Sequence, residues 1–360
     1  MPYIWTLRAG VRGTSLPAFS YRVIPLKSSQ IIMKNSLRRI FGPVMLLVCL
    51  TLSAVPAMAW DDVGHKITAY IAWTRMTPQT RENVIRVLRE APEDAQLSTF
   101  YMNYGAEPET VRKREFFEIV ATWADIVRDR DFPTRYKKYH KGNWHYGDIF
   151  WRQVDGKVEP ASGFEDNGQA IERLIAFDKV VRDASASDKE KAIAIAWIMH
   201  IGGDIHQPLH TSARVTDLEP KGDQGGNLFL LTPKETKRAD QLNLHWLWDS
   251  IVGRNTPLKG SECDREYIES VADQMMKKYP FRKVQGRMEL GDYTAWQKES
   301  FAFNNTDVFT PDLKRFEAPS VRYKRNAYRV AQQQLTLAGY RLGETMNAVF
   351  GGARTTTAGS

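Results

Sequence analysis

Helical periodicity is the feature of this sequence that most narrows the possible folds. Between Val63 and Met76, apolar residues recur at positions 63, 67, 70 and 71, on one face of a helix. Thr77 and Pro78 have the pattern of a helix N-cap and a first-turn proline, which predicts a second helix reaching about Glu90. Similar patterns predict further helices over residues 109–128, 166–183, 188–201, 242–252, 263–278, 291–303 and 321–350.

Alternating strand patterns are scarce in the same part of the chain. Gly156 and Lys157 can turn a small hairpin, and residues 227–231 fit a short extended piece. Residues 222–226 and 351–360 are expected to form a loop and a disordered tail. We therefore expect an all-α fold, a single-domain helical bundle with irregular loops.

Residues 33–59 have the pattern of a secretory signal peptide. A basic start at Met33 precedes an apolar run over residues 40–54, which is too short to span a bilayer. Small residues at Ala57 and Ala59 then predict cleavage after Ala59, which disfavours the alternative of an uncleaved anchor. We interpret residues 1–32 as a gene-model extension. The processed protein would be periplasmic or secreted, without stable membrane association, and would begin with the free amine of Trp60.

The net charge of the chain is much smaller once residues 1–59 are left out. The whole sequence has 50 Lys and Arg against 42 Asp and Glu, but residues 60–360 are nearly neutral, at 43 against 42. This balance does not support a strongly basic nucleic-acid-binding surface. Cys263 is the single cysteine after residue 59, so an internal disulfide is excluded and the core, with metal, must stabilise the fold.

Most of the histidines occur beside a possible metal co-ligand. His200 and Asp204 lie four residues apart near a helix end, and therefore on one helix face, as do His245 and Asp249. The other residues of this kind are His65, Asp125, His145 and, six residues after Asp204, His210. Imidazole and carboxylate groups are natural zinc ligands. With the amine and carbonyl of Trp60 they suffice for three ions, if one Asp bridges two of them.

Each of these residues alone has a simpler explanation. A single His/Asp pair is usually a surface pair or a cap, His145 could be a buried core histidine, and Asp125 could pair with Arg128. The coincidence of so many pairs favours metal binding. His140 and His206 stay outside the predicted set, as a basic surface-loop residue and as a core or supporting residue.

The ordered motifs of the chain resemble those of the class I nucleases, the zinc-dependent, single-strand-specific nucleases of fungi and plants. The resemblance covers residues 60–249, and the helical remainder to about 350 is compatible with it. The motifs are W-x-x-x-x-H at the processed N-terminus, W-A-D-x-x-R, H-Y-x-D, H-x-x-G-D-x-H-Q-P-L-H, G-D-x-G-G-N and N-L-H-x-x-W-D. The resemblance implies a helical bundle of the zinc phospholipase C and class I nuclease type, with a trinuclear zinc domain over residues 60–350.

The resemblance also implies a role for each matched residue. One zinc would be held by Trp60 and His65, a second by Asp125, His145 and His200, and a third by His210, His245 and Asp249. Asp204 would bridge the first two ions. Arg128 would contact the scissile phosphate, Tyr146 would stack on a base, Asp148 would bond the base edge, and Asn227 would lie near the phosphate or base.

The implied reaction is hydrolysis of single-stranded DNA and RNA to 5′-phosphate products, with 3′-nucleotides as further substrates. A metal-bridged water would attack phosphorus, with Asp125, Arg128 and Asp204 as the catalytic groups. Base stacking needs an unstacked base and tolerates any sequence, which would give a single-strand preference. We expect a monomer.

Two rival functions fit part of the pattern. A zinc phospholipase C shares the implied fold, but its first histidine lies further from the tryptophan and its last ligand pair ends in Glu. A structural zinc protein would use cysteine ligands, which are missing here. The chain also departs from the fungal nucleases, since it lacks their disulfides.

Residues 130–142 are basic and aromatic, and we expect a loop there. The loop could follow a nucleic-acid strand, or it could be a solvated surface. Its basic and aromatic residues include Arg135, Tyr136, Lys137, Lys138, Tyr139 and Lys141.

Overall fold

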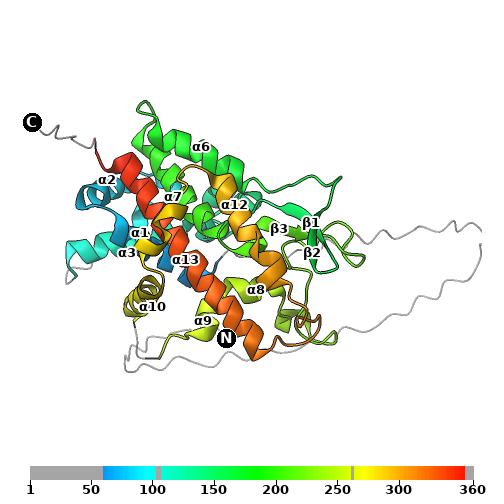
Figure 1. Ribbon diagram of the computed structural model, residues 1–360. Helices are drawn as coiled ribbons and strands as arrows, with labels where there is room; N and C mark the ends of the chain where they lie inside the picture. The colour runs from blue at the N-terminus through cyan, green and yellow to red at the C-terminus, as the bar shows by residue number, and fades with distance from the viewer. Residues whose placement is uncertain (1–59, 103–106, 261–262, 353–360) are drawn as a thin grey trace, which may run out of the picture. The chain divides into compact units, whose positions relative to one another are not determined.

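The computed structural model describes residues 60–102, 107–260 and 263–352. The predicted extension, the signal peptide with its cleavage site, and residues 353–360 of the predicted tail lie outside these residues. None of the helices in the described ranges has the length and apolar character needed to cross a membrane. The fold is all-α, as expected, with one small sheet (Figure 1).

Two helices form the centre of the bundle. α1 (Asp62–Arg75) packs along α13 (Val321–Phe350), the long helix drawn in orange and red in Figure 1. The two backbones approach closely because α13 carries glycines at the contact. A Cβ at Gly339 would lie 2.5 Å from Ile71 Cβ, and one at Gly343 would lie 2.7 Å from the carbonyl oxygen of Ala72. This contact fixes the helix that carries His65.

α7 (Asp188–Asp204) is a second central helix, packed against α6 (Ala170–Arg182) and α2 (Pro78–Arg89). Ser187 and Glu190 close its N-terminus with a reciprocal capping box. Its Ala- and Ile-rich C-terminal half is buried on all sides, so the polar residues His200 and Asp204 lie inside the protein.

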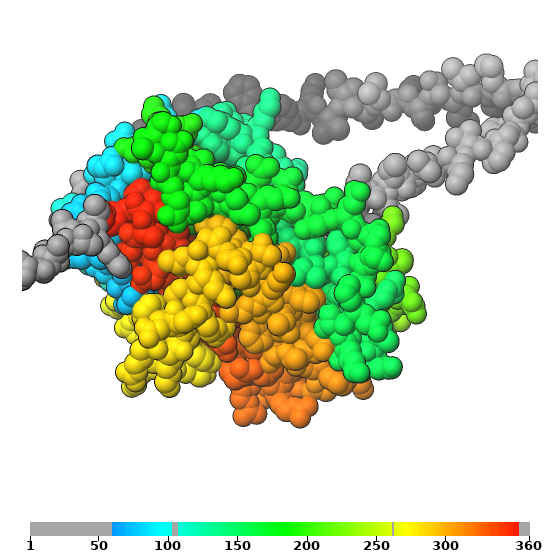
Figure 2. Space-filling view, turned by 45° about the horizontal axis from the view of Figure 1, so that its top comes forward, coloured from blue at the N-terminus to red at the C-terminus, as the bar shows by residue number. Residues whose placement is uncertain are grey.

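The sheet has the strand order β2-β1-β3. β1 (Ile149–Val154) and β2 (Lys157–Pro160) form the predicted hairpin, and β3 (Ser212–Arg214), which was not predicted, pairs parallel with β1. Residues 304–309 lie beside the hairpin (Figure 2), where Gln153 donates to Asn305 Oδ1 at 2.9 Å. The parallel pairing brings the strand start at 149 next to the chain that leaves His210.

The remaining helices complete the bundle around these elements. They are α3 (Glu109–Val120), α4 (Trp123–Ile126), α5 (Pro133–Tyr139), α8 (Leu244–Asp249), α9 (Ile251–Asn255), α10 (Asp264–Lys278), α11 (Phe281–Val284), α12 (Tyr293–Phe301) and a π-helical turn, η7 (Asn304–Val308).

Several predicted helix limits were wrong, and two of the errors affect the site. The helix expected over residues 109–128 breaks after Val120, and the Ala121 carbonyl at the break accepts a hydrogen bond from His200. The helix expected from 166 begins only at Ala170. Gly168 lies against Tyr146, where a Cβ would be 2.3 Å from the Tyr146 carbonyl oxygen. Both limits coincide with tertiary contacts, which the periodicity of the sequence does not reveal.

Other limits differ by less. α7 continues three residues beyond the predicted end at 201, and the helix expected over 242–252 is interrupted at Ser250 between α8 and α9. The expected loop over residues 130–142 contains α5, which begins with Pro133 in its first turn. In the piece at 227–231, only an isolated bridge between Leu230 and Asn243 forms.

Candidate metal centre

Six separate segments bring the predicted ligands together. His65 comes from α1, Asp125 from α4, and His145 from the residue after a 3₁₀ turn. His200 and Asp204 come from α7, His210 from the 3₁₀ turn Pro208–Thr211, and His245 and Asp249 from α8. Their side chains form three sets whose nitrogen or oxygen atoms all lie within 4.8 Å of one another, namely His65/Asp125/His200, His145/His200/Asp204 and His210/His245/Asp249.

The first cluster surrounds the carboxylate of Asp204. His65 Nε2 lies 3.2 Å from Asp204 Oδ1, whereas His145 Nδ1 and His200 Nε2 lie 3.1 and 3.4 Å from Oδ2. His200 Nε2 is also 3.6 Å from Asp125 Oδ1. Asp204 thus turns Oδ1 to His65 and Oδ2 to His145 and His200, an arrangement suited to a carboxylate that bridges two cations.

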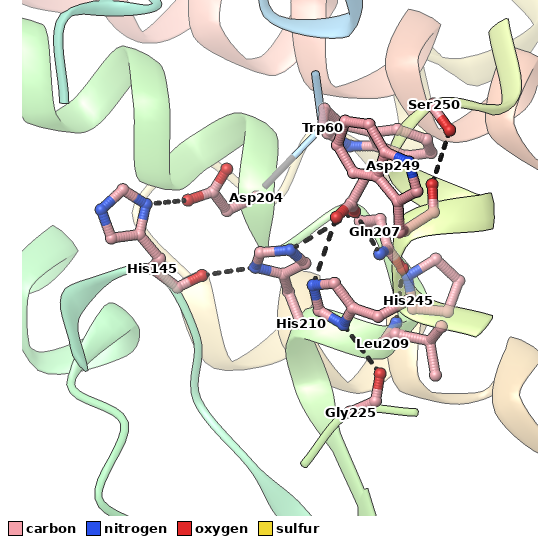
Figure 3. A network of polar contacts seen from close by, with 12 residues as sticks. Trp60, His145, Asp204, Gln207, Leu209, His210, Gly225, His245, Asp249 and Ser250 are labelled. Carbon is pink, nitrogen blue, oxygen red and sulfur yellow. Dashed lines mark hydrogen bonds and ion pairs between the residues drawn. The ribbon is translucent and has the colours of Figure 1, made fainter. Parts of the chain in front are cut away.

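The second cluster lies around Asp249 (Figure 3). His210 Nε2 is 3.6 Å from Asp249 Oδ1, and His245 Nε2 is 3.3 Å from Oδ2. Gln207, buried beneath them, donates from Nε2 to Asp249 Oδ1 at 2.7 Å and accepts from the amide of Leu209 at 2.6 Å. These bonds fix the carboxylate that His210 and His245 face.

Backbone carbonyl groups orient three of the imidazoles. The Nδ1 atoms of His200, His210 and His245 lie 2.7 Å from the carbonyl oxygens of Ala121, His145 and Gly225, respectively. When Nδ1 carries the proton and donates to the carbonyl, Nε2 keeps its lone pair, which points into the cluster. Gly225 has φ +61°, and a Cβ there would lie 2.4 Å from the Leu209 carbonyl oxygen. Glycine is therefore needed for this loop to reach His245.

Many of these buried polar atoms have no hydrogen-bond partner in the described part of the protein. Leaving one such atom unsatisfied costs about 1–3 kcal/mol. A set of them in one place is expected only where a ligand completes their coordination. The residues present therefore fit metal ions. The atoms include His65 Nε2, His210 Nε2, His245 Nε2, Asp125 Oδ1, Asp204 Oδ1 and Asp249 Oδ2.

Burial sets the charge state of the centre. It lowers the pKa of His65 and His200 to about 4 and keeps the imidazoles neutral, the form that binds metal. Burial also raises the pKa of Asp204 and Asp249 to about 7, because a carboxylate charge without a cation is costly there. Cations in the clusters would reverse that cost, so metal binding and deprotonation of these carboxyl groups are coupled.

Trp60 is fully buried, and Figure 3 shows it on the side of Asp249. Its indole Nε1 donates to the carbonyl of Gly203, in the last turn of α7, at 3.1 Å. The next residue, Asp61, donates its amide to the carbonyl of Asp249 at 3.2 Å and caps α1 through Gly64. The segment that precedes α1 is therefore attached to both ligand-bearing helices.

Arg128, a predicted substrate-contacting residue, makes an ion pair with a member of the first cluster. Its Nη2 is 2.9 Å from Asp125 Oδ1, so the simpler explanation for Asp125, an ion pair with Arg128, holds together with its place beside His200. Both side chains are mostly buried. A phosphate reaching the cluster would meet this guanidinium.

The other three predicted substrate residues lie on segments that border the clusters. Tyr146 and Asp148 are half-buried and follow His145, and the Asp148 amide donates to Asp166 Oδ2 at 2.8 Å. Burial, and then the charges of Asp166 and Asp223, raise the pKa of Asp148 well above its usual range. Asn227 donates to the Gln224 carbonyl at 2.8 Å, so its side chain stabilises the loop that carries Gly225.

Sequence reasoning missed Gln207 and the carbonyls that orient the histidines. Gln207 stands between two histidines in H-Q-P-L-H, but its spacing alone does not tell which ligand it would contact. His206 is buried, as expected of a core or supporting residue. Its Nδ1 lies 2.6 Å from the Gly202 carbonyl oxygen, and its Nε2 lies 2.8 Å from Arg341 Nη1. His140 is half-buried rather than a free surface residue and stacks on Tyr136.

The sequence is similar to those of known nucleases. Nuclease S1 of Aspergillus oryzae is 25% identical over 199 residues, which cover 53% of this chain and 53% of that protein, so the match spans about half of the relative. Endonuclease 2 of Arabidopsis thaliana is 23% identical over 86% of this chain and 97% of its own. Endonuclease 4 of the same plant is 24% identical over 61% of this chain and 63% of its own.

A family profile, described as S1/P1 Nuclease, matches residues 60–351, from the tryptophan before α1 to the residue after α13. All of the His and Asp residues of the two clusters fall within this range. The chain therefore belongs to the S1/P1 nuclease family and is an enzyme of the nuclease class.

Proposed function

We propose that the protein is a zinc-dependent endonuclease that hydrolyses single-stranded DNA and RNA to 5′-phosphate products and also removes phosphate from 3′-nucleotides. The observation that carries this proposal is the position of the Asp204 carboxylate, which has His65 at one oxygen and His145 and His200 at the other. A separate set of His and Asp residues around Asp249 supplies a further site. Together they offer ligands for three Zn²⁺.

The ligand assignment follows the two clusters. Trp60, through its freed amine and its carbonyl, joins His65 and Asp204 at the first ion. Asp125, His145, His200 and Asp204 hold the second ion. His210, His245 and Asp249 hold the third. The third set coincides with His210, His245 and Asp249. The separation of the first two ions follows the family resemblance, and in the structure His200 lies close enough to His65, Asp125, His145 and Asp204 to belong to either of the two sets around Asp204.

Different protein groups would act on different parts of the substrate around the scissile phosphate. Zinc, when bound, lowers the pKa of water and polarises phosphoryl oxygens. Arg128, held by Asp125, neutralises charge that develops on the phosphoryl oxygens. Tyr146 offers a ring face for a base, Asp148 offers a carboxyl group for its edge, and Asn227 supports the neighbouring loop. An unstacked base fits this arrangement better than a base pair, which gives the preference for single strands.

The position of Trp60 links function to processing. A buried Trp60 attached to both α7 and α8 suits a chain that begins there, after removal of a secretory signal at Ala59. We place the mature enzyme in the periplasm or outside the cell, as a monomer. A protein retaining Ala59 has an amide where the amine ligand should be, so it should lose the first ion and most of its activity. Full zinc content and activity in that protein would contradict the assignment of Trp60.

The first test uses protein that starts at Trp60, incubated with single-stranded poly(A), with and without a chelator. Release of 5′-AMP that stops with chelator is the expected result. The same protein should leave a short-chain phosphatidylcholine intact. No release from zinc-loaded protein, or hydrolysis of the lipid instead, would contradict the nuclease proposal in favour of a phospholipase.

A further inference from the structure

The segment that joins Arg128 to His145 is attached to the metal centre at both ends. Arg128 pairs with Asp125 at the beginning, and His145 faces Asp204 at the end. The residues between them, including α5, therefore begin and end beside the place where a scissile phosphate would meet Arg128. We call residues 129–142 the rim segment.

The inner side of the rim segment is firmly anchored. Arg135 is buried and donates to Gln96 Oε1 at 2.9 Å and to the Ile126 carbonyl at 3.1 Å. Tyr139 is buried with its ring edge against Trp123, and its hydroxyl donates to Asp94 Oδ1 at 2.7 Å. Tyr136 is therefore carried by an anchored helix, and Arg130 and Lys141 lie just outside the two ends of that helix.

The outer side of the rim segment carries stacked rings and cations. Tyr136 stacks on His140 with ring centroids 4.8 Å apart, and the Arg130 guanidinium lies 5.4 Å from the Tyr136 ring. Burial, followed by the positive charges of Arg128, Arg130 and Lys141, lowers the pKa of His140, and the charge of Asp125 opposes them. Three cations and the Asp125 carboxylate thus act on this imidazole.

Most of this positive charge is left without a carboxylate partner. Within the described ranges, the ion pairs of Arg128 and of the rim segment join Arg128 to Asp125 and Lys138 to Asp94, and none involves Arg130 or Lys141. Asp129 and Asp131 flank Arg130 in the sequence, and Asp129 Oδ1 accepts the amide of Asp131 at 2.9 Å, but neither carboxylate is paired with Arg130 or Lys141 in the described ranges. Cations that lack an ion-pair partner can bind an anion that approaches them. The anion that this enzyme meets at the adjacent centre is a nucleic-acid backbone.

We propose that Arg130 and Lys141 form a subsite for the phosphate next to the scissile one in a single strand, supported by the Tyr136–His140 stack. This inference rests on the proposed function and deepens its substrate. Guanidinium and ammonium groups both bind phosphate well. A dinucleotide without terminal phosphates has the scissile phosphate alone, so the subsite acts only on longer strands.

The test compares two substrates of the zinc-loaded enzyme and its double variant Arg130→Gln/Lys141→Gln. The substrates are the dinucleotide ApA, without terminal phosphates, and a single-stranded oligoadenylate of 12 nucleotides. For the longer strand we expect kcat/KM to fall about 10-fold, mainly because KM rises. The slope of log kcat/KM against log salt concentration should become less negative by about one, because one phosphate contact is lost. Cleavage of ApA should stay within about twofold, because no second phosphate is present.

Lys179→Gln/Lys189→Gln is the matched control. It removes the same charge from exposed positions on α6 and in the first turn of α7, while His200 lies near the other end of α7. Both substrates should be cleaved by this variant as by the wild type. An equal loss on both substrates in the Arg130/Lys141 variant would overturn the inference, as would no loss on the longer strand. A zinc-loaded wild type that cleaves neither substrate would overturn the proposed function together with the inference.

Discussion

At the scale of single residues, Gln207 illustrates how a side chain that binds no metal can control one that does. Its amide is fully buried and makes two hydrogen bonds, to Asp249 and to the backbone of Leu209. Without it, Asp249 would lose a donor that fixes its orientation toward His210 and His245. Residues of this kind usually contribute a large part of metal affinity.

Gln207→Met should therefore weaken binding of the zinc assigned to His210, His245 and Asp249 about 10- to 100-fold. The measurement is a zinc titration against a competing chelator. Asn347→Leu is the control, since Asn347 makes comparable hydrogen bonds to Arg75 and Thr77, which carry no ligand. It should lower stability without changing zinc affinity. Equal zinc affinity in the Gln207 variant and the wild type would show that Asp249 needs no such support.

Glu118 is a residue whose protonation affects stability away from the centre. Burial raises its pKa from 4.5 to about 8, although Arg114 Nε lies 3.4 Å from Oε1. A carboxyl group with a raised pKa in the folded state binds its proton more tightly there than in the unfolded chain. Its contribution is therefore favourable below pH 4.5 and is lost as the pH rises from 4.5 toward 8.

Glu118→Gln should remove this loss, because the amide stays neutral. Between pH 5 and pH 8, the free energy of unfolding of the variant should rise relative to wild type by on the order of 2 kcal/mol. Urea unfolding of both proteins at the two pH values measures this difference. Glu90→Gln, at an exposed position, should show no such trend. A Glu118→Gln protein with the same pH dependence as wild type would contradict the argument.

At the scale of elements, the sequence predicts most helices but not where tertiary contacts interrupt them. α1, α7 and α13 have long apolar patterns, and each begins within one residue of its predicted start. The break at Ala121 and the late start of α6 depend on His200 and Tyr146, residues distant in the sequence. β3 is three residues long, too short for an alternating pattern to identify.

The contact between α1 and α13 gives a prediction at this scale. Gly339→Ala places a Cβ where the distance to Ile71 Cβ would be 2.5 Å, so the two helices must separate. We expect a loss of about 1–3 kcal/mol in the free energy of unfolding. Gly286→Ala, at a position with nothing within 4 Å, is the control and should change stability little. Chemical denaturation of the wild type and of both variants measures these differences. A Gly339→Ala protein as stable as wild type would contradict the close packing of the two helices.

At the scale of the whole molecule, the clusters show what a sequence can and cannot reveal. The helical spacing of His200 with Asp204 and of His245 with Asp249 predicted two pairs that the fold preserves, each with both side chains in one cluster. The division into a cluster around Asp204 and another around Asp249 came from resemblance rather than from spacing, because it depends on how α1, α4, α7 and α8 meet. The carbonyls that orient the histidines could not be predicted, since backbone groups leave no sequence signal.

The measurement that tests the central claim most directly is the zinc content per chain of protein starting at Trp60, measured by elemental analysis after dialysis. We expect three zinc ions in the wild type, two in Asp249→Ala, and one in Asp204→Ala, because Asp204 would serve two ions and Asp249 one. A wild type with a single ion, or the same loss in both variants, would contradict a trinuclear centre divided in this way.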